Sequence, residues 1–403
     1  MLIVAVINAV NGGLRSGVVT VPWQTLVADE NPLPTGVKLR PMNGDRTPLP
    51  SQVDVLDPDD PSRTCVSIYA KNVEGNGYGY AAPSLWLSVE LGDSPGGEGP
   101  KVLHQKEEHV KAVPIDLSDG TPKDGIILKN DRLEAFVQLP RGPAGWQAGA
   151  VTSVLIFNRD ILDAFKAEDG WQDLDPEKRL QVDYVSVPKP PWAEAPAARF
   201  AVFDRDWSYV ASGQGPVRAF VTIKSPMFTV IHADFGEGEQ EKFADETYDD
   251  IKYECHLYRS ISLHRNADYL LEEMWVRGKN KKHGTMQTMS FAPHFFLKMK
   301  VGVPPPLRRQ PENDWFAIGA TGAPLQGYGF AANWAVGRIE NPPADYPNDK
   351  PEDKWGAFGW PVGFGRTVRC LHLFKRGLQP EQMADETGRH WFDLIYNPMR
   401  AAV

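Results

Sequence analysis

Short alternations of apolar and polar residues dominate the first part of the chain. Runs such as GVVTVPW, GVKLRPM, CVSIYAK and SLWLSVEL alternate or carry β-branched residues, and Gly, Pro, Asn or Asp separates them. A period of two places apolar side chains on one face of a strand, and the separating residues favour turns. The pattern predicts a small N-terminal β-barrel-like domain built from short strands.

A turn-rich segment, SDGTPKDG at residues 118–125, follows this region. Its glycines and proline interrupt regular structure, so we expect a domain boundary there, between residues 1–120 and 121–403. Beyond it, runs such as IILKNDRLEAFVQL predict about ten or more further strands, while RDILDAFKAE and QPEQMADE are the candidate helices. This region is typical of a large antiparallel β-sandwich, or supersandwich, with few short helices. The predicted fold class is therefore all-β.

The longest alternation, at residues 253–279, predicts a β-hairpin that turns at residues 265–268. An antiparallel register gives three cross-strand pairs: Ser260 with Glu273, Tyr258 with Trp275, and His256 with Arg277. We expect the apolar face to be buried; it carries Cys255, Leu257, Ile261, Leu263, Leu270, Met274 and Val276. Arg259 and Glu272 fall on the same face, close enough to pair diagonally.

The other face of the hairpin has a composition typical of sugar sites, in which an aromatic ring supports a pyranose and polar groups bind its edge. We expect four of its residues to bind substrate: Trp275, Arg277, Glu273 and His264. In a β-elimination of a uronate, Arg277 would neutralise the carboxylate, and His256 or Tyr258 would remove the C5 proton. His294, among aromatic residues, would join from a neighbouring strand or lie in the core. The alternative is a solvent-facing sheet with aromatic cross-strand pairs.

Charge and composition narrow the range of partners. The 403 residues carry a formal net charge of −9, and no basic stripe alternates with aromatic residues. We therefore expect neither nucleic acid nor an anionic membrane as a partner. A polyanionic substrate remains compatible, because a few local arginines can hold a carboxylate in an acidic protein.

Several chemical motifs are absent from the sequence. It has no phosphate-binding Gly-Lys loop, dinucleotide fingerprint, HExxH or GxSxG, which argues against nucleotide enzymes, zincins and α/β hydrolases. Cys65, Cys255 and Cys370 are too far apart for a metal motif or a disulfide framework, so we expect free thiols and no metal site. Residues 231–250 predict a solvated acidic loop and residues 54–62 a turn, with calcium as the alternative at each. No other cofactor is expected.

The opening MLIVAVINAVNGG is apolar but short and has no preceding basic segment. It predicts either a first strand or a vestigial export signal. It is shorter than the roughly 18 apolar residues of a membrane span, so we expect a soluble or exported protein, the exported form being secreted or periplasmic.

Two sets of segments resemble a known family. VVTVPWQ and LPTGVKLRPMNGDRTPLPSQVDVL, with Gly44 and the Leu-Pro-Ser-Gln of residues 49–52, are similar to the N-terminal RIFT-type barrel of the exo-acting rhamnogalacturonan lyase family. IILKNDRLEAFVQL and SGQGPVRAFVTIKS resemble the central β-sandwich of that family and, more loosely, galactose-mutarotase-like supersandwiches. That family continues into a helical α/α toroid, and this chain has no long helical run. The resemblance therefore implies one of three arrangements: a sandwich that works alone, a toroid supplied by a second chain, or a protein that only binds or builds.

Together these observations predict a carbohydrate-active protein that binds a polysaccharide or glycoside and cleaves it by lyase or hydrolase chemistry. The alternative is a non-catalytic structural or adhesion protein, such as a surface or virion component, assembled as a homo-oligomer. The sequence leaves the sugar, the linkage and the oligomeric state open.

Overall fold

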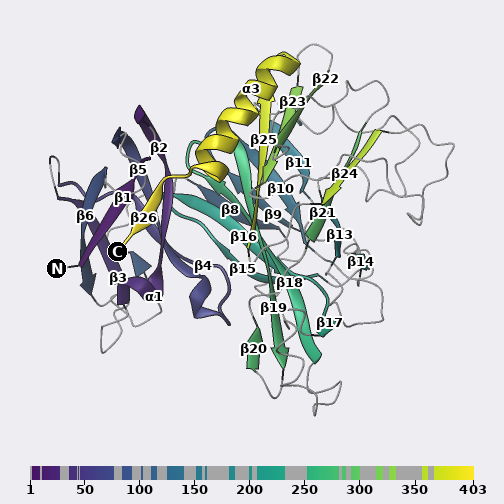
Figure 1. The fold of residues 1–403 in the computed structure, drawn as a ribbon, viewed down its shortest axis with the longest axis horizontal. Coiled ribbons are helices and arrows are strands. Elements are labelled where there is room, and N and C mark those ends of the chain that lie inside the picture. Colours follow the sequence, from purple (N-terminus) through teal and green to yellow (C-terminus); the bar gives the residue numbers. More distant parts are fainter. Residues whose placement is uncertain are drawn as a thin grey trace, which may run out of the picture.

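Strands form nearly all of the regular structure in the computed structural model of this chain (Figure 1). The structure describes residues 2–9, 11–27, 36–42, 44, 46–76, 84–92, 101–102, 110–115, 125–139, 151–156, 159–160, 181–186, 199–201, 207–231, 252–280, 284–286, 292–299, 315–320, 326–332, 356–361 and 367–403. Among the described strands every pairing is antiparallel except that of β3 with β7. The all-β prediction is confirmed. The sequence predicts a helix at residues 159–168. Its first two residues instead form the short strand β12, and the rest lies outside the described residues.

Two sheets, called the N-terminal sheets below, share one hydrophobic core. The first has the order β26 (Arg400–Ala402), β1 (Leu2–Ile7), β6 (Leu85–Gly92), β3 (Gly36–Pro41) and β7 (Lys101–Val102). The second has the order β2 (Asn11–Pro22), β5 (Thr64–Asn76) and β4 (Ser51–Val55). Their alternating apolar residues, including Val19, Val66 and Ile68, pack together with Trp23 of helix α1 (Trp23–Val27). Because β26 comes from the other end of the chain, the last residues complete the first sheet.

The largest sheet, called the large sheet below, is built from segments far apart in sequence. Its order is β15 (Ser208–Gly213), β16 (Arg218–Lys224), β18 (Lys252–His264), β19 (Tyr269–Asn280), β25 (Val368–Arg376), β23 (Gln326–Ala332) and β22 (Trp315–Ala320). β17 (Phe228–Ile231) pairs with β18, and β20 (Gly284–Met286) pairs with β19.

Two further sheets complete the fold. One has the order β12 (Arg159–Asp160), β11 (Val151–Ile156), β10 (Glu134–Gln138), β9 (Gly125–Lys129) and β8 (Lys111–Ile115). The other has the order β14 (Arg199–Ala201), β13 (Gln181–Ser186), β21 (Ala292–Met299) and β24 (Gly356–Pro361). β8 precedes the turn-rich segment and pairs with β9 beyond it. No helix in the described part of the chain has the length and hydropathy needed to cross a membrane.

The predicted hairpin is present as β18 and β19, in the predicted register. Ser260 faces Glu273, Tyr258 faces Trp275, and His256 faces Arg277. Asn266 occupies the turn with a φ of 58°, a conformation that asparagine adopts more readily than most residues.

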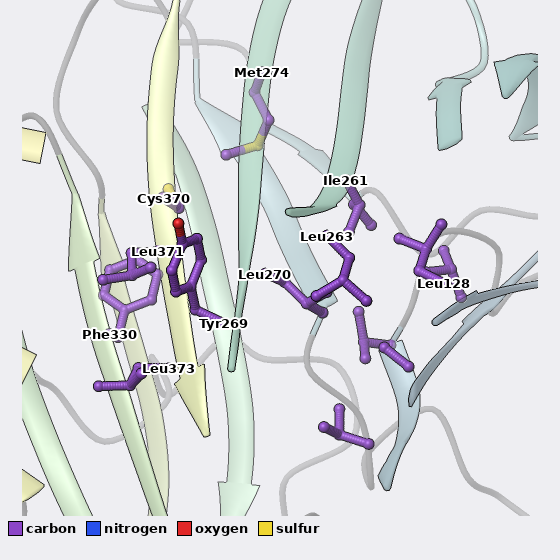
Figure 2. Close-up of a cluster of buried hydrophobic side chains, with 14 of the residues drawn as sticks. Leu128, Ile261, Leu263, Tyr269, Leu270, Met274, Phe330, Cys370, Leu371 and Leu373 are labelled. Atoms are coloured by element: carbon purple, nitrogen blue, oxygen red, sulfur yellow. The ribbon is translucent and has the colours of Figure 1, made fainter. Parts of the chain in front are cut away.

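The apolar face of the hairpin lies in the main core, as predicted. Leu257, Ile261, Met274 and Val276 belong to the same buried cluster. Figure 2 shows Leu263 and Leu270, from the two strands of the hairpin, with Leu128 of the five-stranded sheet that contains β9. Burial of apolar side chains between the two sheets is what stabilises the sandwich.

A charged cluster crosses this otherwise apolar core. Arg259 Nε lies 2.5 Å from Glu272 Oε1, which confirms the predicted pair. Glu272 Oε2 lies 3.1 Å from His372 Nε2, and the Tyr328 hydroxyl lies 2.9 Å from His372 Nδ1. All four side chains are buried. Burial alone would raise the pKa of Glu272, but Arg259 and His372 outweigh it and lower that pKa to about 2.

The C-terminal helix α3 (Pro380–Trp391) packs across β22 and β23, and it confirms the helix predicted near residues 379–386. A Cβ on Gly329 of β23 would lie 2.0 Å from Thr387 Oγ1, so only glycine allows this close approach. A π-helical turn (Phe392–Tyr396) then leads the chain to β26 in the N-terminal sheets (Figure 1).

Candidate functional site

The polar face of the hairpin is covered by the segment that runs from β4 through the short helix η1 (Pro61–Arg63). Tyr258 and Trp275 are 2% and 1% exposed, and Leu56 packs with them in a separate hydrophobic cluster. Their rings stack with centroids 5.4 Å apart and planes 9° apart. The aromatic pair predicted from the register therefore exists, and it faces protein rather than an open surface.

Arg277 and His256 also have protein partners. Arg277 Nη1 lies 2.7 Å from Asp57 Oδ2, and Arg277 Nη2 donates a hydrogen bond of 2.7 Å to the Tyr258 hydroxyl. His256 Nδ1 lies 2.8 Å from the Ser225 carbonyl oxygen. The segment at residues 54–62, where the sequence predicts a turn, thus places the acidic side chain of Asp57 against Arg277. Among the described residues, no three or more potential metal ligands lie together as a group.

His294 lies on β21, in the four-stranded sheet rather than in the large sheet. Its backbone pairs with Tyr184 of β13 and with Pro361 of β24. The structure therefore does not bring its strand next to the hairpin, and its side chain lies outside the described part of the chain.

Two of the predicted site residues, His264 and Glu273, line a cavity of about 820 Å³. This cavity, called the cleft below, lies between β2 of the N-terminal sheets, the large sheet and the segment from α3 to β26. Its charged lining includes Arg15, Arg63, Arg218, Glu273, Arg369 and Asp393. The volume falls in the range of roughly 300–1,000 Å³ that is typical of ligand sites.

Glu273 presents an ionised carboxylate to the cleft. Its neighbour across the sheet, Arg369 of β25, places Nε 2.7 Å from Glu273 Oε1. Burial would raise the pKa of Glu273, but Arg369, Arg218 and Arg63 outweigh it, so that the pKa falls below its usual range. Glu273 is therefore suited to accept hydrogen bonds rather than to donate a proton at pH 7.

His264 presents a neutral imidazole to the same cleft. It is 5% exposed, its Nδ1 lies 3.4 Å from the Tyr269 hydroxyl, and its Nε2 has no hydrogen-bond partner among the described residues. Burial, together with the positive charge of Arg218, lowers the pKa of His264 to about 3. The ring therefore stays uncharged at pH 7.

A buried network fixes the floor of the cleft to the N-terminal sheets. Arg218 Nε lies 2.7 Å from Asp54 Oδ2, and Gln52 Oε1 accepts hydrogen bonds from the backbone N–H groups of Val217 and Arg218 at 2.9 and 3.0 Å. Gln52 is the glutamine of the Leu-Pro-Ser-Gln sequence noted above. Its side chain therefore has a structural role: it joins β4 to β16. Burial raises the pKa of the neighbouring Cys65 thiol to about 12.

Arg63 is a functional candidate that the sequence did not reveal. Its guanidinium carbon lies 4.4 Å from the centroid of the Trp275 ring, and its Nη1 lies 3.5 Å from Thr367 Oγ1. Burial is the main cause that lowers its pKa. Arg63 is the last residue of η1, whose sequence is Pro-Ser-Arg, and nothing in that sequence links Arg63 to a hairpin about two hundred residues later. The link appears only in the fold, where η1 packs on Trp275.

No family model and no curated protein matches this chain. An alpha-mannosidase from Enterococcus faecalis V583 matches with a TM-score of 0.43 and 10% identity, over 99% of this chain and 45% of that one. A glycosyl hydrolase family 38 protein from Enterococcus faecalis gives the same TM-score and identity, over 99% and 47%.

A galactose mutarotase-like protein from Clostridium acetobutylicum is also similar, with a TM-score of 0.31 and 9% identity, over 67% of this chain and 98% of that one. This chain thus spans less than half the length of the first two structures. None of these three proteins is described as a rhamnogalacturonan lyase, and at these identities and TM-scores they assign no family to this chain.

Proposed function

We propose that this protein is carbohydrate-active and that it binds a polysaccharide or glycoside in the cleft. The observation that supports the proposal is the convergence of Glu273, His264 and several arginines on one cavity of about 820 Å³. Sugar hydroxyls need acceptors and donors at fixed positions, and these side chains offer both.

The state of the lining groups favours binding by hydrogen bonds. Glu273, ionised, accepts from hydroxyl groups, while His264 offers an unpartnered Nε2 and Tyr269 lies beside it. Arg369 holds the Glu273 carboxylate in place through its 2.7 Å contact. Pre-organised polar groups of this kind lower the cost of ordering a site when ligand binds.

Cleavage by lyase or hydrolase chemistry is the second part of the proposal. His256 and Tyr258 remain the candidate proton-transfer groups, and Tyr258 is covered by the segment around Leu56. Their participation would require that segment to move away from the hairpin. Trp275 would act indirectly, because its ring supports Arg63 at the cleft wall.

A glycan panel tests both parts. Binding is measured by calorimetry, lyase chemistry by the absorbance of unsaturated uronates, and hydrolysis by release of reducing ends. Glu273→Gln should weaken binding of the selected glycan by about tenfold or more, since it removes a charged acceptor. Glu90→Gln is the matched control, because Glu90 is exposed on β6 and pairs with Arg40.

The outcomes separate the candidate functions. If Glu273→Gln binds the selected glycan as tightly as the unaltered protein, the cleft is not the binding site. If no glycan binds at all, the proposal fails, and light scattering then tests whether the protein assembles as an oligomer, as the structural or adhesion alternative predicts.

A further inference from the structure

Arginines are the most frequent charged residues in the lining of the cleft. Six of them line it, against two carboxylates, Glu273 and Asp393. Two more carboxylates, Asp54 and Glu386, pair with lining arginines from outside the lining. The six arginines therefore outnumber these four carboxylates by two, although the whole chain has a formal net charge of −9. A concave site with an excess of one sign attracts ligands of the opposite sign.

Arg63 differs from its neighbours in how its charge is compensated. Arg15, Arg218 and Arg369 each have a carboxylate within 3.0 Å. No carboxylate lies within ion-pair distance of Arg63 among the residues that the structure describes. An arginine that is partly removed from water without a partner is unfavourable, and a bound anion would relieve this cost.

The geometry around Arg63 leaves most of its donors unused. A guanidinium has five N–H donors, and the described contacts of this one are the 3.5 Å approach of Nη1 to Thr367 Oγ1 and the stacking on Trp275. Its Nε has no hydrogen-bond partner in the described part of the chain. Because the Trp275 ring is buried and stacked on Tyr258, it holds the guanidinium in a fixed orientation.

We infer that Arg63 binds an oxyanion of the ligand, a carboxylate or a sulfate ester, at the wall of the cleft. The planar fork of a guanidinium matches two oxygens of such a group, and the contact is charge-assisted. Three acidic groups lie near Arg63: Glu273, Asp60 and Asp57. Arg369 pairs with Glu273 at 2.7 Å and Arg277 pairs with Asp57 at 2.7 Å, so these two carboxylates are already compensated when an anion binds. The inference rests on the proposed function, because it assumes that the cleft holds the carbohydrate.

The test compares two oligosaccharides of equal length, one neutral and one carboxylated or sulfated, by calorimetry on the full chain. The unaltered protein should prefer the charged ligand by about ten- to a hundredfold, as expected for a charge-assisted hydrogen bond. The preference should fall as salt concentration rises. Arg63→Gln should abolish this preference, because it lowers affinity for the charged ligand far more than affinity for the neutral one.

Two further variants keep the test decisive. Arg63→Lys retains the positive charge but loses the planar pair of guanidinium donors, so it should give an intermediate preference. This variant replaces Arg63→Gln in the test if Arg63→Gln does not fold. Arg40→Gln changes a half-buried arginine of β3 outside the cleft, so it should leave the preference as it is in the unaltered protein. Equal preference for the charged ligand in the unaltered protein and in a folded Arg63→Gln variant would overturn the inference.

Inorganic sulfate separates this inference from the proposed function. If glycans bind in the cleft without a preference for charge, the oxyanion site is wrong and the proposed function stands. If no glycan binds but sulfate binds and Arg63→Gln removes it, the oxyanion site stands and the carbohydrate proposal fails. Sulfate binding that Arg63→Gln leaves intact places the anion elsewhere and counts against the inference.

Discussion

Arg277 of β19 and Asp57 of the turn after β4 form a buried ion pair, with 2.7 Å between Nη1 and Oδ2. The two side chains are 6% and 1% exposed. They join the hairpin to the segment that covers it. Removing one partner of a buried ion pair strongly destabilises a protein, because the other charge then stays buried without compensation.

Arg277→Ala should therefore act mainly on stability. We expect a loss of about 3–5 kcal/mol in the free energy of unfolding, measured by urea denaturation. The matched variant Arg40→Ala, which breaks an exposed pair with Glu90, should cost less than about 1 kcal/mol. A stable Arg277→Ala variant that loses only glycan binding would instead restore Arg277 as a substrate ligand.

Tyr258→Phe addresses the catalytic role predicted for the hairpin. The hydroxyl accepts a hydrogen bond from Arg277, so its removal should cost about 1–3 kcal/mol of stability. If Tyr258 is the base, turnover on a cleaved glycan should also fall by roughly 10²–10⁴. The same assay on His256→Ala distinguishes the two candidates, since only the true base gives the large loss. Full turnover in both folded variants would remove both from the mechanism.

The lowered pKa of Glu272 implies that the free energy of unfolding depends on pH in the acid range. This pKa is about 2 in the folded chain and 4.5 ordinarily, so the unfolded state binds more protons between these values. The stability that it contributes is complete above pH 4.5 and is lost as the pH falls toward 2. Glu272→Gln should cost about 3–5 kcal/mol at pH 7, because Arg259 is then buried without its partner.

The stability difference between Glu272→Gln and the unaltered protein should shrink as the pH falls from 4.5 to 2. Denaturation curves at several pH values measure it, and Glu90→Gln is the exposed control. A difference that stays constant over this range would show that folding does not lower the pKa of Glu272.

Leu257→Ala tests the core face of the hairpin. Leu257 is 1% exposed within the main cluster, so its truncation should cost about 2–5 kcal/mol through lost burial and a residual cavity. Met227→Ala, at a side chain that is 56% exposed, should stay within about 0.5 kcal/mol. A cost below about 0.5 kcal/mol for Leu257→Ala would contradict the assigned face.

Gly329→Ala tests the docking of α3 on the large sheet. The added Cβ would meet Thr387 Oγ1 at 2.0 Å, and the overpacking should cost about 1–3 kcal/mol. Thr387→Ala removes the atom that lies closest to this Cβ, so the double variant should lose less stability than the two single variants together. Strict additivity of the three measured values would show that α3 does not pack against Gly329.

The sequence by itself determined the local structure of the hairpin. Alternation with a period of two assigns each side chain to one of two faces, and the turn at Asn266 fixes which residues face one another. The register, the buried apolar face and the Arg259–Glu272 pair all follow from these local rules. His264 and Glu273 could be placed on the other face for the same reason.

Only the tertiary structure decided what covers each face. A period of two shows that a strand has two faces, but it does not show whether the second one meets water or another part of the protein. Here that face meets Leu56, Asp57 and Arg63, about two hundred residues earlier in the chain. Polar residues that suggested an open sugar surface therefore became buried partners of these side chains. The cleft lies between the N-terminal sheets, the large sheet and the segment from α3 to β26, and His264 and Glu273 line it.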